Sequence, residues 1–263
     1  MAGIRRTSVD ELAGLFRALG AGPGDVVMVH SAVFTLGRVE NGLAGLYQAV
    51  RQVIGPEGTL VAPTFTYSFR RREVFDVRGT PSSREIGVFS EYVRGLPGAV
   101  RSLDPLFSMV AVGPEAEALM EHKVKHSFGP GSVYERLFER DMLLAALGIT
   151  YDTGLSAFMH LEKLAGVDYR IDLLCRGTTV GYDGLAFADE ITHYARHEEK
   201  YPRGDRNRIP FGKRMEADGV ATALDFGSGR HVALRAKPFA EYTLEALAKD
   251  PHVMFRSGVA NEK

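Results

Sequence analysis

Apolar residues recur along the N-terminal part of the chain in two alternating patterns. Stretches with helical spacing are followed by short continuous apolar runs, which are typical of buried strands. Ser8 and Glu11 have the spacing of a capping box, so a helix is expected to begin there. The pattern predicts, in order, helix 8–19, strand 25–30, helix 41–54 and strand 59–63. Helices that alternate with strands indicate an α/β fold whose sheet is at least partly parallel.

The central part of the chain continues this alternation, and the last third is less regular. The predicted elements there are an extended loop over 65–83, helix 86–96, strand 109–113, helices 114–121 and 133–138, strand 142–147 and helix 156–165. The remaining ones are strand 176–182, a segment over 188–201 that is either strand or helix, polar loop 203–210 and surface helix 239–249. We expect one domain over residues 1–263, with an irregular C-terminal third at about 171–263.

Composition and charge restrict the class of protein. Hydrophobic residues make up 45% of the chain and charged residues 25%, which excludes disorder or a coiled coil as the overall structure. The net charge is -1, and the densest basic cluster is the three arginines at 70–72. Binding to nucleic acid needs a larger cationic face, so no nucleic-acid partner is expected.

The compartment is predicted from what the chain lacks. No apolar run approaches the ~18 residues of a membrane-spanning helix, and residues 1–8 contain no apolar core of a signal peptide. Cys175 is the one cysteine, which excludes an intramolecular disulfide and a cysteine-rich metal site. Its apolar neighbours favour a buried, inert thiol in a reducing compartment. We therefore expect a cytoplasmic protein without a membrane partner.

The motifs of several large enzyme classes are missing from the sequence. It contains no P-loop, no GxGxxG after a strand, no GxSxG and no HExxH, so nucleotide hydrolysis, dinucleotide redox chemistry and zincin chemistry lose their usual support. His193 and His197 are four residues apart and would share a face of a helix, a spacing that can bind metal. Because no third ligand lies nearby, a metal-dependent hydrolase is only a weak hypothesis, and no metal is expected.

His160 and Glu162 are the strongest candidates for catalysis. They lie where a predicted helix begins just after a predicted strand, which is a common position for catalytic side chains. An imidazole can accept a proton from an amine, and a carboxylate can orient it. However, residues two apart point about 200° from each other on a regular helix, so both cannot face one cleft. Catalytic and structural roles both stay open from spacing alone.

Two other places offer polar groups to a ligand. Arg101 and the hydroxyls of Ser102 and Ser108 lie in a turn-rich loop that would suit an anionic ligand such as a phosphate. The alternative is a structural loop in which Arg101 pairs with a local carboxylate. His30 ends an apolar strand, where ligands gather in α/β sheets, although a structural histidine fits that position equally well.

Short segments between residues 8 and 180 form an ordered set. They are 24–31 with 36–37, 55–66, 75–76 with 80–82, 87–94, 97–102 with 105 and 108, 129–132, 147–148 and 165–170. Each segment is short, but together they resemble the antibiotic N-acetyltransferase family, which includes the aminoglycoside 3-N-acetyltransferases. The resemblance implies that family's layered α/β/α fold with a mixed sheet, and not the smaller GNAT fold.

The resemblance also implies an activity. The family transfers acetyl from acetyl-CoA to an amine by direct attack, without an acyl-enzyme. His160 matches the family's general base, and Glu162 would be the acid that holds it. The residues implied in holding acetyl-CoA follow the first two predicted strands or belong to the loop over 101–108: His30, Ser31, Ala32, Val33, Thr64, Phe65, Thr66, Arg101, Ser102 and Ser108.

The catalytic segment departs from the family pattern. The family reads His-x-x-Glu there, whereas this chain reads His160-Leu161-Glu162. One alternative is the deletion of one residue with a remodelled helix start, which we favour because the local pattern before His160 is kept. In the other, Glu162 is in register and Met159 takes the position of the histidine. The family often has His-Pro where this chain has Asp104-Pro105, and the C-terminal part looks closer to members that act in biosynthesis.

The acceptor is expected to be a small amine. An aminoglycoside is polycationic and needs an acidic site, for which the candidate carboxylates are Asp76, Glu91, Asp152, Asp189 and Glu190. Of these, Asp76, Asp152 and Glu190 are assigned to substrate binding together with Tyr67. The net charge of -1 favours a less cationic amine, such as an amino sugar on a nucleotide. The alternative function is that of a catalytically degenerate protein that binds CoA or a small ligand. For assembly, the sequence leaves open whether the protein forms a homodimer.

Overall fold

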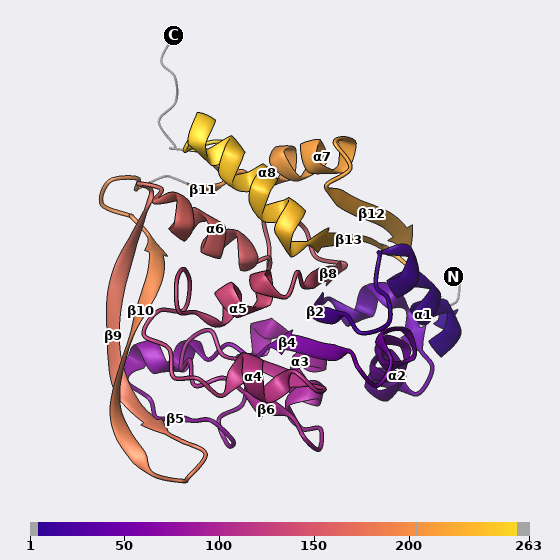
Figure 1. Cartoon of the computed structure of the whole chain (residues 1–263), viewed down its shortest axis with the longest axis horizontal. Helices are drawn as coiled ribbons and strands as arrows, with labels where there is room; N and C mark the ends of the chain where they lie inside the picture. The colour runs from indigo at the N-terminus through magenta and orange to yellow at the C-terminus, as the bar shows by residue number, and fades with distance from the viewer. Residues whose placement is uncertain (1–4, 203–204, 257–263) are drawn as a thin grey trace.

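A mixed seven-stranded sheet lies at the centre of the molecule (Figure 1). The computed structural model describes residues 5–202 and 205–256, and the statements below concern these residues. In spatial order the strands are β12 (Ala221–Phe226), β13 (Gly229–Arg235), β8 (Leu143–Leu147), β2 (Val26–Ser31), β4 (Thr59–Pro63), β7 (Met109–Val112) and β6 (Val100–Arg101). Strand β2 pairs in parallel with β4 and β8, and the other neighbours are antiparallel. The expected α/β fold with a mixed sheet is confirmed.

Helices cover both faces of this sheet, because side chains alternate in direction along each strand. Val27 and Val29 pack against α1 (Val9–Ala18), α2 (Gly42–Ile54) and α3 (Val88–Arg94). Met28 faces the other layer. That layer consists of α4 (Ala116–Met120), α5 (Val133–Glu139), α6 (Ala157–Ala165), α7 (Arg208–Ala217) and α8 (Ala236–Lys249). Within the described residues, no helix is both long enough and apolar enough to cross a membrane.

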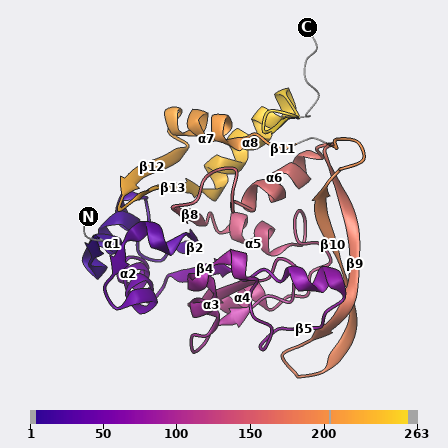
Figure 2. The same cartoon turned by 180° about the vertical axis from the view of Figure 1, so that it is seen from behind.

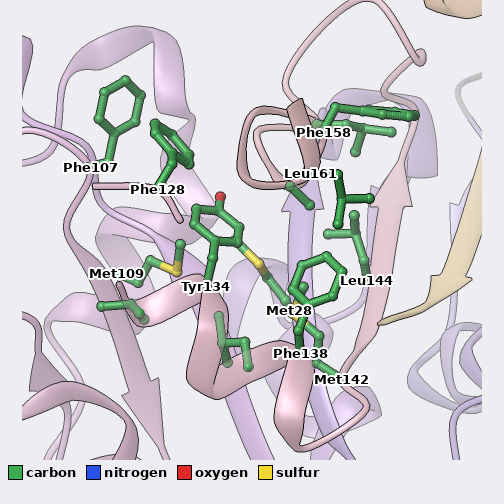
Figure 3. Packing of buried hydrophobic residues seen from close by; sticks show 14 of the residues in the cluster. Met28, Phe107, Met109, Phe128, Tyr134, Phe138, Met142, Leu144, Phe158 and Leu161 are labelled. Carbon is green, nitrogen blue, oxygen red and sulfur yellow. The ribbon is translucent and has the colours of Figure 1, made fainter. Parts of the chain in front are cut away.

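Aromatic rings pack against one another in series in the second layer (Figure 3). The ring of Phe107 lies 4.8 Å from that of Phe128, and the ring of Phe128 lies 5.2 Å from that of Tyr134. Edge and offset contacts at these distances stabilise packing beyond simple burial. These rings join α5 to the segments that precede it, and the Tyr134 ring stacks at 5.9 Å from that of His160 on α6.

A long antiparallel ribbon stands beside the sheet, formed by β9 (Arg170–Val180) and β10 (Ala186–Arg196) (Figures 1 and 2). It pairs Arg170 with Arg196 at one end and Val180 with Ala186 at the other. The segment over 188–201, for which the sequence left strand and helix as alternatives, is thus largely strand. Strand β9 begins earlier than the predicted strand 176–182. His193 lies on β10 and His197 follows it, so the two share no helical face.

The C-terminal third is more regular than the sequence predicts. The expected polar loop over 203–210 includes β11 (Asp205–Arg206) and the start of α7, while 203–204 lie outside the described residues. Helix α7 accepts Pro210 because the first turn of a helix needs no amide donor there. The hairpin of β12 and β13 was also not predicted. The expectation of one domain over 1–263 stays a prediction.

Smaller elements join these parts. They are β1 (Arg6–Thr7), the 3-10 turns at Val33–Leu36, Tyr67–Arg71 and Arg84–Ile86, β3 (Arg38–Val39), β5 (Phe75–Asp76) and β14 (Phe255–Arg256). The capping box at the start of α1 is confirmed, since the Ser8 hydroxyl accepts from the Glu11 amide and the Glu11 carboxylate accepts from the Ser8 amide at 2.8 Å. The predicted loop over 65–83 contains two of these elements, the 3-10 turn at Tyr67–Arg71 and β5.

Candidate active site

The carboxyl ends of β2, β4 and β8 meet at one edge of the sheet. Strands β4 and β8 lie on opposite sides of β2, which makes this edge a topological switch point, where α/β proteins bind ligands. His30 ends there with its side chain almost completely buried, and its Nε2 has no hydrogen-bond partner. Burial lowers the pKa of His30 to about 4, so the imidazole is neutral. Ser31, Ala32 and Val33 follow and are partly exposed.

A cavity of about 370 Å³ opens next to the end of β4. Its walls come from the segment after β4, the start of α6, the base of the β9–β10 ribbon, and the segments around β11 and β14. The lining residues are Phe65, Tyr67, Phe107, Gly154, Leu155, Ser156, Met159, Glu162, Tyr169, Arg170, Arg196, Glu198, Asp205, Arg206, Arg208, Met254 and Phe255. This volume is in the range that holds a small organic molecule.

Helix α6 turns Met159 and Glu162 into this cavity, because residues three apart share a helical face. His160 lies on another face and is 2% exposed. Its ring stacks at 4.9 Å from the ring of Phe138, and its Nδ1 accepts a hydrogen bond of 3.1 Å from the amide of Gly129. Burial lowers the pKa of His160 to about 4. The structure therefore does not bring the His160 imidazole to the cavity.

Glu162 is bound to two arginines. Its carboxylate accepts hydrogen bonds from Arg170 and, at 2.6 Å, from Arg208. Burial alone would raise the pKa of Glu162, but the charges of Arg208 and Arg170 outweigh it and hold this pKa below its usual value. The assignment of Glu162 as the acid that orients His160 stays a prediction, and in this structure both carboxylate oxygens face guanidinium groups.

Arg101 is buried inside the protein, next to the segment that follows β4. Its guanidinium donates to the Thr64 carbonyl at 2.7 Å, to the Ser108 hydroxyl at 3.1 Å and to the Thr80 carbonyl, and it stacks over Phe75 at 4.9 Å. The side chain is 2% exposed. The assignment of Arg101 to acetyl-CoA stays a prediction, and in this structure its guanidinium is hydrogen-bonded within the protein. The group holds the loop over 101–108 against the segment that follows β4.

The other polar residues of this loop are also bonded within the protein. The Ser102 hydroxyl accepts from the Met109 amide at 3.0 Å, and the Thr66 hydroxyl donates to the Pro105 carbonyl at 2.9 Å. Asp104 accepts from two amides of the loop, and burial raises its pKa to about 6. The assignment of these hydroxyls to acetyl-CoA stays a prediction, and in this structure they are hydrogen-bonded within the protein.

Of the four residues expected to bind the substrate, Tyr67 lines the cavity and the three acidic ones lie elsewhere. Asp152 accepts from the Arg208 amide at 2.7 Å and so holds the start of α7. Asp76 accepts from amides of its own turn, and Glu190 pairs with Arg176 on the outside of the ribbon. These three carboxylates are not among the cavity-lining residues.

The other two candidate carboxylates are also bound to partners within the protein. Glu91 binds Arg94 and Ser82, and Asp189 binds Lys123 and Thr179. Of the charged residues that line the cavity, Glu162 was a candidate from the sequence, and the others were missed because they come from distant segments. Among these others, only Arg170 carried a signal, as the last residue of the segment 165–170 of the family resemblance.

The described residues contain no group of three or more histidine, cysteine or acidic side chains that could hold a metal ion. The ring of His193 stacks on that of Phe107 at 5.5 Å, and Nδ1 of His197 accepts from the Lys200 amide at 3.3 Å. The two histidines therefore have separate environments. Burial raises the pKa of the half-buried Cys175 thiol, which disfavours its thiolate.

Acid is expected to destabilise the protein through its buried histidines. His30 and His160 titrate at about 4 in the folded chain and near 6.5 when unfolded, so the unfolded state binds more protons between these values and stability falls as pH falls. Asp104 acts in the opposite direction, because its folded pKa of about 6 lies above the unfolded value. The net loss from these three groups is about 2 kcal/mol between pH 6.5 and 5.

Urea unfolding at pH 7, 6.5, 6 and 5 measures this loss directly. An unfolding free energy that stays constant or rises on acidification would contradict the buried, neutral state of the two histidines. His122 is exposed, so its replacement by asparagine serves as a control that should leave the pH dependence unchanged.

The layers and the cavity define a class of protein, a layered α/β protein with a small-molecule cleft at the carboxyl end of its parallel strands. Within that class, the family model described as aminoglycoside 3-N-acetyltransferase matches residues 28–248. The chain belongs to this family, as the sequence resemblance predicts.

Relatives and solved structures agree with this membership. The aminoglycoside N(3)-acetyltransferase IV of Salmonella sp is 35% identical over 178 residues, which cover 66% of this chain and 64% of the relative. The match thus spans slightly less than two thirds of that relative's length. Another relative, the aminoglycoside N(3)-acetyltransferase VIII of Streptomyces fradiae, is 35% identical over 56% of this chain and 58% of its own.

Two solved structures share the fold. The structure of AAC-IIIb in a binary complex with CoASH superposes with a TM-score of 0.80 at 24% identity, over 93% of this chain and 97% of that one. A histidine-to-alanine mutant of aminoglycoside acetyltransferase AAC(3)-IVa, in complex with a gentamicin, gives a TM-score of 0.79 at 25% identity, over 97% of this chain and 93% of that one.

Proposed function

We propose that this chain transfers the acetyl group of acetyl-CoA to the amine of an aminoglycoside, an amino sugar or a related small molecule. Family membership supports the reaction class. The observation that carries the proposal is the cavity of about 370 Å³ beside the carboxyl end of β4, within the matched region. Acetyl-CoA would reach it along the partly exposed residues Ser31, Ala32 and Val33 at the end of β2.

The proposed reaction is a direct attack. The amine nitrogen bonds to the carbonyl carbon of the thioester, the carbon–sulfur bond breaks, and CoA leaves as the thiolate. After the attack the nitrogen carries a positive charge, and it loses one proton to give the neutral amide. The released thiolate takes up a proton, so the products are an amide and CoASH.

The geometry favours the second alternative for the catalytic segment. Helix α6 is continuous from Ala157 to Ala165, with Met159 in the cavity and His160 in the core. A thioether is not a base at neutral pH, so Met159 cannot accept the amine proton. We infer that the amine enters as its free base, and that the reaction rate follows the unprotonated fraction of the amine.

The variant His160→Asn separates the two assignments. Asparagine keeps an oxygen that can accept from the Gly129 amide but removes the titrating imidazole. Because His160 is buried outside the cavity, we expect kcat to stay within about threefold of the parent value. A general base contributes typically 10²–10⁴-fold, so a loss of that size in a folded variant would restore His160 as the base.

The proposed function is tested by thiol release from acetyl-CoA, followed colorimetrically with a panel of amines. The panel holds aminoglycosides, amino-hexoses, their nucleotide conjugates and simple diamines. Rapid release with one class of amine is the expected result and identifies the acceptor class. A protein that neither releases thiol nor binds CoA would overturn the proposal.

Met159 in the cavity also favours a second candidate, a protein that binds CoA or a small ligand without turnover. Calorimetry with CoA and the thiol assay distinguish the two candidates. Binding of CoA without thiol release from any amine supports the second candidate, and release supports the first.

A further inference from the structure

The residues that line the cavity carry one more positive charge than negative charges. Four arginines and three carboxylates line it. Among them, the single carboxylate of Glu162 is shared by the guanidinium groups of both Arg170 and Arg208. Their side chains are 1%, 10% and 2% exposed, so water screens this excess only weakly.

Two hydrogen-bond donors in the same place have no acceptor. Nε of Arg208 and the hydroxyl of Tyr169 are buried, and within the described residues neither has a hydrogen-bond partner. Both residues line the cavity. Leaving a buried polar group without a partner is unfavourable, so these donors are complementary to oxygen atoms that a ligand would bring.

We propose that the acceptor amine carries an anionic oxygen group, a carboxylate or a phosphate, which binds at Arg208 and Tyr169. This inference rests on the proposed function and names its substrate class. The anion would balance the excess positive charge and accept from both free donors. A polycationic aminoglycoside would instead meet a cavity with one more cation than anions, which disfavours its binding.

The lining of the cavity also indicates how such an acceptor would lie. The anionic group is placed at Arg208, and part of the lining is apolar, formed by Phe65 and Phe107 with ring centres 5.0 Å apart. Phe65 lies two residues after the end of β4, near the strand ends where acetyl-CoA is proposed to enter. In this proposal the amine points toward the strand ends and the anion stays at Arg208 and Tyr169.

The test compares amines that differ in charge. Glucosamine, glucosamine 6-phosphate, an aminouronic acid, a uridine diphosphate amino sugar and an aminoglycoside are assayed for thiol release, and their binding is measured by calorimetry. We expect kcat/KM for an anionic amine to exceed that for glucosamine at least tenfold, with the phosphate and carboxylate compounds showing which anion is preferred. Equal or better binding and turnover of glucosamine or the aminoglycoside would overturn the inference.

The two proposals fail in different ways. Absence of thiol release with every amine argues against the proposed transferase, and calorimetry still reports whether anionic amines bind more tightly. Thiol release without preference for an anionic amine leaves the transferase standing and removes only the anion site.

Tyr169→Phe tests the site with the least disturbance, because it removes an unpartnered hydroxyl and keeps the ring that stacks on Phe255 at 4.2 Å. We expect about a tenfold rise in KM and Kd for the anionic amine, with kcat within twofold, since a hydrogen bond to a charged group contributes about 1.5–3 kcal/mol. Tyr47→Phe, on α2 across the sheet, is the matched control. An unchanged Kd in the Tyr169 variant would show that its hydroxyl does not contact the ligand.

Discussion

Replacing Glu162 with glutamine is expected to lower the free energy of unfolding by about 3–5 kcal/mol, the usual effect of removing one partner from a buried ion pair. The glutamine fills the same volume but leaves Arg170 and Arg208 facing each other in a buried place without a countercharge. Most of the loss comes from these uncompensated charges rather than from missing contacts. Urea unfolding at neutral pH measures it.

Glu245→Gln is the matched control, because the same substitution there removes an ion pair with Lys249 whose side chains are 65% and 73% exposed. Exposed pairs of this kind contribute about 0–1 kcal/mol. If both variants lost less than about 1 kcal/mol, the buried cluster would not depend on the Glu162 charge.

The second large expected effect is a gain in the rate of acetyl transfer. Met159→His places an imidazole in the cavity, three residues before Glu162, and so restores the spacing that the family pattern shows. We expect kcat/KM for acetyl transfer to rise by on the order of 10², because a positioned general base contributes 10²–10⁴-fold. The pH–rate profile should also gain a limb near 6.5, the ordinary pKa of histidine.

Met159→Gln controls for a polar side chain of similar length that does not titrate. It should bind CoA as the parent does and show neither the gain nor the new limb. A folded histidine variant with unchanged rate and profile would mean that the amine reacts away from the face of α6 that carries residue 159.

The first half of the fold follows from local pattern. Strand β4 coincides with the predicted 59–63, and the capping box places the start of α1, because these elements carry strong periodicity and a local signal. Helix α7 carries no such signal. Pro210 and Gly212 resemble loop residues, yet Pro210 fits the first turn, and a Cβ at Gly212 would lie 2.1 Å from the Tyr151 ring.

The site was harder to predict than the fold because its charges meet only in three dimensions. Glu162 was identified, but Arg208 lies 46 residues later and no periodic pattern joins them. The assignment of His160 rests on the family resemblance and on the local pattern before it. Phase alone already favoured Met159 and Glu162 on one face, and the continuous helix α6 keeps that phase.

The β9–β10 ribbon connects two distant parts of the protein. Arg170 lies in the cavity at one end, and beyond the other end the Tyr182 hydroxyl donates to the Arg101 carbonyl at 2.7 Å. Because side chains alternate along a strand, inserting a single residue between these points would turn everything beyond it to the opposite face. Inserting two residues on each strand keeps this alternation, whereas a single inserted residue reverses it or has to form a β-bulge. Each paired insertion would lengthen the span from the cavity to the loop over 101–108 by about 7 Å.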